Sequence, residues 1–176
     1  VLTPNLESFY QPGADLNLLG TSVSMAQDLL SQFAGSADFA DDLGVAFGDY
    51  DRAIAESIAK KWAEDDFGEL PAIEILSSDI MGGANGAFAK STNKIYLAED
   101  FVNSGSLSEI VSVIVEETGH FIDSQINMVD AVGDEGEIFA NVVQGNVLSD
   151  AELAVLRGED DWGVITVGGV DIAVEQ

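Results

Sequence analysis

The chain contains no cysteine, and its six lysines and arginines stand against 32 aspartates and glutamates. Without cysteine, disulfides and thiolate metal sites are excluded, so any bound metal needs oxygen and nitrogen ligands. The formal net charge of −26 disfavours nucleic acid and anionic membranes as partners, because affinity for both depends on Lys and Arg neutralising phosphates. An acidic surface attracts cations, calcium above all, although solubility alone explains such a surface equally well.

Long hydrophobic runs are also missing. No run of about 18 apolar residues predicts a membrane span, and the stretch after Val1 lacks the basic and apolar regions of a signal peptide. A chain that begins at Val1 is expected to be part of a larger polypeptide. With 176 residues, 47% of them hydrophobic, the chain is long enough to bury a core, and we expect one domain over 1–176.

The spacing of apolar residues predicts an α+β fold in three parts. A loop-like arm (1–20) and three helices make up 1–69, a small twisted sheet with an edge hairpin and two further helices make up 70–145, and a helix with a closing hairpin makes up 146–176. Thr21 or Ser22, and later Ser106 or Ser108, are the expected helix caps. The expected helices are 21–33, 36–48, 51–67, 107–126, 135–143 and 151–157, and the expected strands are 70–76, 87–89, 94–97, 164–167 and 170–174.

The predicted helix 107–126 carries an unusual polar cluster. Apolar residues surround almost the whole helix, which predicts that it is buried. Charges inside such a helix are costly unless they are paired or bound to a cation. Glu116 and His120 are four residues apart, so they share one face, and Asp123 extends that face. A helix offers two ligands to one metal ion by this i, i+4 geometry, whereas a hydrogen-bonded core histidine is the structural alternative.

A third ligand is expected from a second helix. Glu135 and Glu137 stand at the start of the predicted helix 135–143, before an apolar stretch. Acids at a helix N-terminus also have a structural explanation, because they complement the helix dipole and cap free N–H groups. This explanation fits Glu135 better than Glu137, which directly precedes apolar residues.

Two motifs carry a resemblance to a known family. EETGHFID (116–123), followed by DEGEIFA (134–140), resembles the gluzincin metallopeptidases, in particular the anthrax-lethal-factor-like peptidase domains, with their H-E-x-G-H-x-x-D and N-E-x-E-F-F-A patterns. The zincin-like part covers about residues 70–145. Nearly the whole chain also resembles domains of large secreted cyanobacterial proteins with RTX-type calcium-binding repeats. The resemblance implies a zincin-like fold and an extracellular, secreted location.

Carried over by position, the resemblance assigns roles to several residues of the two motifs. It implies that His120 and Glu137 are metal ligands and that Glu117 is the general base. Asp123 and Glu135 are expected to contact the ligands rather than the ion. Tyr96 is a candidate substrate contact, although a strand tyrosine also fits packing. The positions implied by the resemblance are His120, Glu137, Glu117, Asp123 and Glu135, whereas the family's transition-state-stabilising Tyr or His has no counterpart here and Tyr96 is a separate candidate.

The sequence departs from the family at its first ligand, where Glu116 replaces histidine. A site of Glu116, His120 and Glu137 can still bind a divalent metal. Zinc is expected first, and the two carboxylates favour manganese, iron(II) or calcium more than the family's ligands do. One hypothesis is therefore a metallopeptidase that hydrolyses peptide or protein substrates with metal-activated water and Glu117 as base.

Two further hypotheses follow from the same residues. A catalytically degenerate zincin-like domain could serve as a structural or calcium-dependent module of a larger extracellular protein. A hydrolase or oxygenase with an iron or manganese site is the third possibility, because one histidine with two carboxylates suits those metals.

Overall fold

The computed structural model describes residues 15–176, so most of the expected N-terminal arm (1–14) lies outside the described residues. The described part is α+β, as predicted. Its helices are α1 (Leu16–Ala34), α2 (Phe39–Phe47), α3 (Arg52–Ala63), α4 (Ser78–Met81), α5 (Glu99–Ser104), α6 (Leu107–Ile126), α7 (Glu135–Val143) and α8 (Asp150–Leu156). Its strands are β1 (Ala72–Leu76), β2 (Gly86–Ala89), β3 (Lys94–Ala98), β4 (Trp162–Val167) and β5 (Val170–Glu175).

Several expected boundaries are wrong. The expected helix 36–48 begins only at Phe39, the expected helix 51–67 ends at Ala63, and the expected strand 164–167 begins at Trp162. Helix α1 also begins earlier than predicted. The carboxylate of Asp15 accepts two backbone N–H groups of the first turn, so the helix starts at Leu16 and not at Thr21 or Ser22. The short helices α4 and α5 were not predicted. By contrast, α6 and α7 have the predicted bounds, and Ser106 caps α6.

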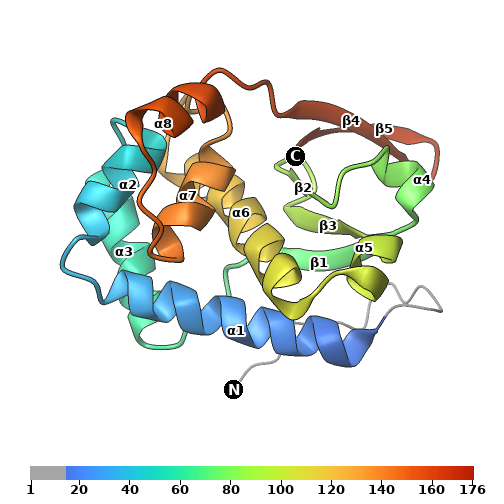
Figure 1. Ribbon diagram of the computed structural model, residues 1–176, viewed down its shortest axis with the longest axis horizontal. Coiled ribbons are helices and arrows are strands. Elements are labelled where there is room, and N and C mark those ends of the chain that lie inside the picture. Colours follow the sequence, from blue (N-terminus) through green and yellow to red (C-terminus); the bar gives the residue numbers. More distant parts are fainter. Residues whose placement is uncertain (1–14) are drawn as a thin grey trace.

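The strands form one mixed sheet in the order β1-β3-β2-β5-β4. β1 runs parallel to β3, and the other neighbours are antiparallel. Both predicted hairpins form, and Gly168 and Gly169 turn the β4–β5 hairpin with φ of 60° and 84°. The β2–β3 hairpin was expected at the edge of the sheet, but it lies inside, because β1 pairs with β3 and β5 pairs with β2. β5 meets β2 through the single pair Phe88 and Glu175. The C-terminal hairpin thereby extends the sheet and brings the chain end toward the helices (Figure 1).

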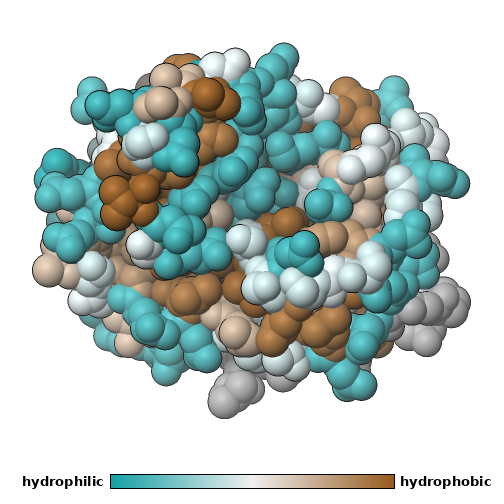
Figure 2. Space-filling model, viewed as in Figure 1, coloured by the Kyte–Doolittle hydropathy of each residue, from teal (hydrophilic) through white to brown (hydrophobic). Residues whose placement is uncertain are grey.

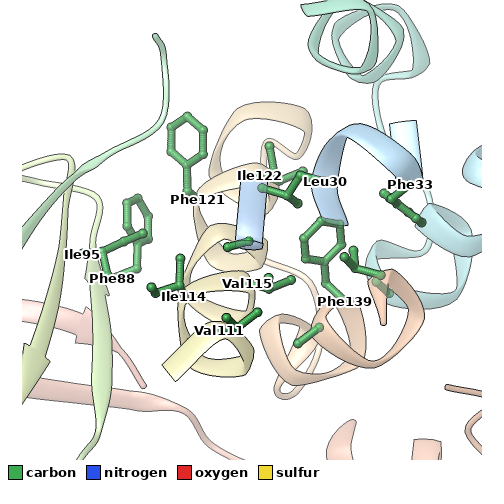
Figure 3. Close-up of a cluster of buried hydrophobic side chains, with 14 of the residues drawn as sticks. Leu30, Phe33, Phe88, Ile95, Val111, Ile114, Val115, Phe121, Ile122 and Phe139 are labelled. Carbon is green, nitrogen blue, oxygen red and sulfur yellow. The ribbon is translucent and has the colours of Figure 1, made fainter. Parts of the chain in front are cut away.

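Helix α6 lies between the sheet and helices α1 and α7, and both of its sides are buried (Figures 1 and 3). On the sheet side, the rings of Phe121 and Phe88 meet edge to face with centroids 6.0 Å apart. On the helical side, Val115 lies toward Phe139 of α7, whose ring meets Phe33 of α1 edge to face at 5.6 Å. The prediction of a buried helix is confirmed, so the polar side chains of α6 are enclosed with it.

Hydrophilic side chains cover much of the face seen in Figure 2, as the net charge requires. Among the described residues, no helix combines the length and apolar character needed to cross a bilayer.

Candidate metal centre

The single histidine, on α6, lies against Gly136 of α7. A Cβ at Gly119 of α6 would lie 2.9 Å from the Cα of Gly136 in α7. The two helices can approach this closely because both positions are glycine. A Cβ at Gly136 would overlap the imidazole of His120. The imidazole ring of His120 therefore fits between the helices because these two positions carry no side chain.

The His120 ring is fully buried and faces carboxylates from three directions. Its Nδ1 lies 2.8 Å from Glu135 Oε1, 3.6 Å from Asp161 Oδ2 and 3.7 Å from Glu175 Oε2. A carboxylate only accepts hydrogen bonds, so Nδ1 donates to Glu135. The oxygens of Asp161 and Glu175 are beyond hydrogen-bond distance from Nδ1 and contribute charge instead.

These carboxylates come from distant parts of the sequence. Glu135 is the first residue of α7, and Glu175 is the last residue of β5. Asp161 directly precedes β4, and its carbonyl accepts the N–H of Gln176 at 2.9 Å, which ties the two ends of the hairpin together. The C-terminal hairpin thus delivers two acids to a histidine on α6.

Five buried side-chain atoms in the described part of the chain have no hydrogen-bond partner. They are Glu117 Oε2, His120 Nε2, Glu135 Oε2, Asp161 Oδ2 and Glu175 Oε2. Buried polar groups are nearly always paired, and a buried carboxylate without a partner costs several kcal/mol. Unpaired atoms concentrated around one histidine are therefore the strongest chemical signal in the molecule.

Charge in this cluster shifts the ionisation of its members. Burial alone would lower the pKa of His120, but the hydrogen bond to Glu135 and the neighbouring negative charges raise it to about 10. Burial raises the pKa of Glu175 to about 7 and that of Asp161 to about 6. Burial also holds the pKa of Glu117 well above its usual range. The cluster therefore favours a central cation and resists carrying its full negative charge.

His120, Glu135 and Glu175 form a group that could hold a metal ion, because one ligand atom from each lies within 4.8 Å of the other two. The predicted set of Glu116, His120 and Glu137 is not among the groups in residues 15–176 that meet this distance. Glu137 is exposed and groups instead with Asp134 and Glu159. Residues two apart on a helix differ by about 200° in direction, so α7 turns Glu135 toward His120 and Glu137 away.

Glu116 is half-buried on the side of α6 that faces the start of α7. Burial, together with the negative charges of Asp134 and Glu137, raises its pKa to about 7, while His120 opposes this shift. Glu116 thus belongs electrostatically to the acids around the start of α7.

The other predicted residues are all buried but have different neighbours. Glu117 is buried, and a Cβ at Gly86 of β2 would overlap its Oε1. Asp123 is buried, and its Oδ1 accepts a hydrogen bond from the Asn127 side chain at 2.7 Å. Tyr96 is also buried, with its hydroxyl 3.1 Å from the Thr92 hydroxyl.

Sequence reasoning missed Asp161 and Glu175. The sequence signal at Glu175 is weak: an acid follows the apolar pair Ala173 and Val174 at the end of a predicted strand. Nothing in the local pattern indicates that this strand ends against α6.

Comparison with models of protein families, with curated proteins and with solved structures gave no match in any of the three searches.

Proposed function

We propose that this chain is a non-catalytic cation-binding domain, in which a divalent metal held by His120, Glu135 and Glu175 joins the C-terminal hairpin to the α6–α7 pair. The observation that carries the proposal is the convergence of unpaired, buried carboxylate oxygens on one imidazole. A divalent ion offsets their mutual repulsion and satisfies lone pairs that otherwise remain unpaired.

The distances support ligands of a small divalent ion. Two atoms bound to one ion at about 2.0–2.2 Å are separated by roughly 3–4 Å. The separation of 3.7 Å between His120 Nδ1 and Glu175 Oε2 falls in this range. The shorter contact of 2.8 Å to Glu135 is a hydrogen bond, so an ion at Nδ1 replaces the proton held there. One imidazole with carboxylates suits zinc, manganese and iron(II).

Burial supports a structural rather than a catalytic ion. His120 and Glu135 are both 0% exposed. Of the three proposed ligands, only Glu175 lines a cavity found among the described residues, a small one of about 280 Å³ that neither His120 nor Glu135 lines. A metal that activates water for peptide hydrolysis needs an open coordination position that substrate can reach.

Peptide-bond hydrolysis is the second candidate function. It is favoured by Glu117, whose buried Oε2 has no hydrogen-bond partner and whose pKa burial raises, because a general base must take up a proton. In that case, purified metal-loaded protein should cleave members of a peptide library, and Glu117→Gln should abolish the cleavage. Turnover with this dependence would refute the non-catalytic proposal.

The direct test is calorimetric titration of EDTA-treated protein with zinc and manganese. We expect one ion per chain at the His120 cluster and a higher melting temperature when it is bound, because a ligand that binds only the folded state stabilises it. Glu175→Gln should weaken binding by about tenfold or more, equivalent to at least ~1.4 kcal/mol. Glu56→Gln removes an exposed acid of α3 and should leave the affinity unchanged. Equal affinities in the two variants would refute the proposed site.

A further inference from the structure

We infer that a second cation, calcium, binds beside the first at Asp123, Asp130 and Glu135, so that the Glu135 carboxylate bridges two ions. One carboxylate oxygen from each of the three residues lies within 4.8 Å of the other two. The inference rests on the proposed function only because Glu135 serves both sites.

Glu135 provides the link between the two positions. It is fully buried, and its Oε1 is occupied by His120 Nδ1 at 2.8 Å. Its Oε2 is buried without a hydrogen-bond partner. A carboxylate can bind two cations, one through each oxygen, and such bridging would satisfy the atom that the His120 interaction leaves unpaired.

Asp123 and Asp130 complete an oxygen-only site. Asp123 is buried; Asn127 Nδ2 donates to its Oδ1 at 2.7 Å, and the N–H of Ala131 makes only a long contact of 3.4 Å with its Oδ2. Its second oxygen therefore keeps most of its capacity to bind a cation. Asp130 is exposed and lies in the loop between α6 and α7, so the ion can arrive from solvent.

The two sites offer different ligand atoms and therefore suit different metals. The first group includes an imidazole nitrogen, which suits zinc, manganese and iron(II). The second offers only carboxylate oxygens, and calcium accepts six to eight oxygens in flexible geometry, including loop carbonyls and water. Three acids around a partly exposed position therefore favour calcium there.

A tryptophan reports on this second site. The indole N–H of Trp162 donates to Asp130 Oδ2 at 3.2 Å, so an ion that recruits Asp130 changes the surroundings of the indole. The chain has two tryptophans, and Trp62 belongs to α3. A Trp62→Phe background therefore assigns the fluorescence to Trp162 alone.

The experiment titrates calcium into the zinc-loaded Trp62→Phe protein, followed by fluorescence and by calorimetry. We expect a saturable change with one calcium per chain. Asp130→Asn should weaken calcium binding by about tenfold, since affinity follows the ligand charge count, and should leave the zinc isotherm within about twofold. The matched control, Asp28→Asn, removes an exposed acid of α1 and should change neither isotherm.

The outcomes distinguish the calcium site from the proposed metal site at His120. No saturable calcium binding, or equal calcium affinity in Asp130→Asn and Asp28→Asn, overturns the second site while leaving zinc binding intact. Calcium binding that depends on Asp130 but is accompanied by no zinc binding at His120 supports the second site and overturns the proposed function. Glu135→Gln should weaken both isotherms, and loss of only the zinc isotherm would refute the bridging role.

Discussion

Substitution of Gly136 by alanine tests the closeness of the two helices around the histidine. The added Cβ would overlap the His120 ring and would lie 2.6 Å from Cε1 and 2.8 Å from Cδ2. Atoms of a packed core do not approach so closely, so the ring or α7 must shift. The shift would move Nδ1 relative to its hydrogen-bond partner Glu135 and to the nearby carboxylate of Glu175.

Two opposing effects determine how much Gly136→Ala changes the free energy of unfolding. Replacing a helical glycine with alanine gains about 0.5–1 kcal/mol from backbone entropy and helix propensity. Overpacking a filled core costs about 1–3 kcal/mol. Steric overlap dominates at this position, so we expect Gly136→Ala to lower the free energy of unfolding by about 1–2 kcal/mol. Gly20→Ala is the matched control, since a Cβ there meets nothing within 4 Å inside α1, and it should stabilise the protein.

Urea unfolding of both variants, with and without zinc, measures the effect. We expect Gly136→Ala to unfold at lower urea and to bind zinc more weakly, while Gly20→Ala unfolds at higher urea with unchanged zinc affinity. If Gly136→Ala is as stable as Gly20→Ala and keeps its zinc affinity, the ring does not lie against α7 as described, and the reasoning fails.

Three other predictions concern pH, capping and packing. In EDTA, the raised pKa values of His120 (about 10) and Glu175 (about 7) mean that the folded state binds more protons than the unfolded state. The stabilisation from Glu175 is complete below about pH 4.5 and lost through pH 7, and that from His120 is complete below about pH 6.5 and lost through pH 10. Unfolding free energy should therefore fall from pH 5 to pH 8 in urea titrations without metal; a rise would contradict these shifts. Ser106→Ala removes the α6 capping box and should cost about 1 kcal/mol without weakening zinc binding; an unchanged urea midpoint would show that the cap is unimportant. Phe139→Ala should cost about 3–5 kcal/mol, because its ring is fully buried among aromatic neighbours; a loss below 1 kcal/mol in the same assay would contradict that packing.

Local signals predicted the two helices that carry the centre. Ser106 with Glu109 marks the start of α6, and Asp134 caps α7 through a 2.7 Å bond from the N–H of Glu137, so both bounds follow from short-range chemistry. The start of α1 was missed because Asp15 follows a Pro- and Gly-containing stretch that resembles a loop.

The candidate site was only partly readable from the sequence. His120 stood out because it is the only histidine and lies in an apolar helix beside several acids. The sequence favoured Glu137 over Glu135 as a ligand, but which acid faces the histidine depends on how α7 is rotated against α6, and the glycine contact sets that rotation. Asp161 and Glu175 depend on the pairing of β5 with β2, a long-range contact that local periodicity does not encode.

The central claim is that a metal ion joins the C-terminal hairpin to the α6–α7 pair. A crystal structure of the zinc-loaded protein, with anomalous scattering measured on both sides of the zinc absorption edge, tests it most directly. The account predicts one zinc peak about 2.0–2.2 Å from His120 Nδ1 and from oxygens of Glu135 and Glu175. A zinc ion bound instead by Glu116 and Glu137, or no anomalous peak at His120 under saturating zinc, would contradict it.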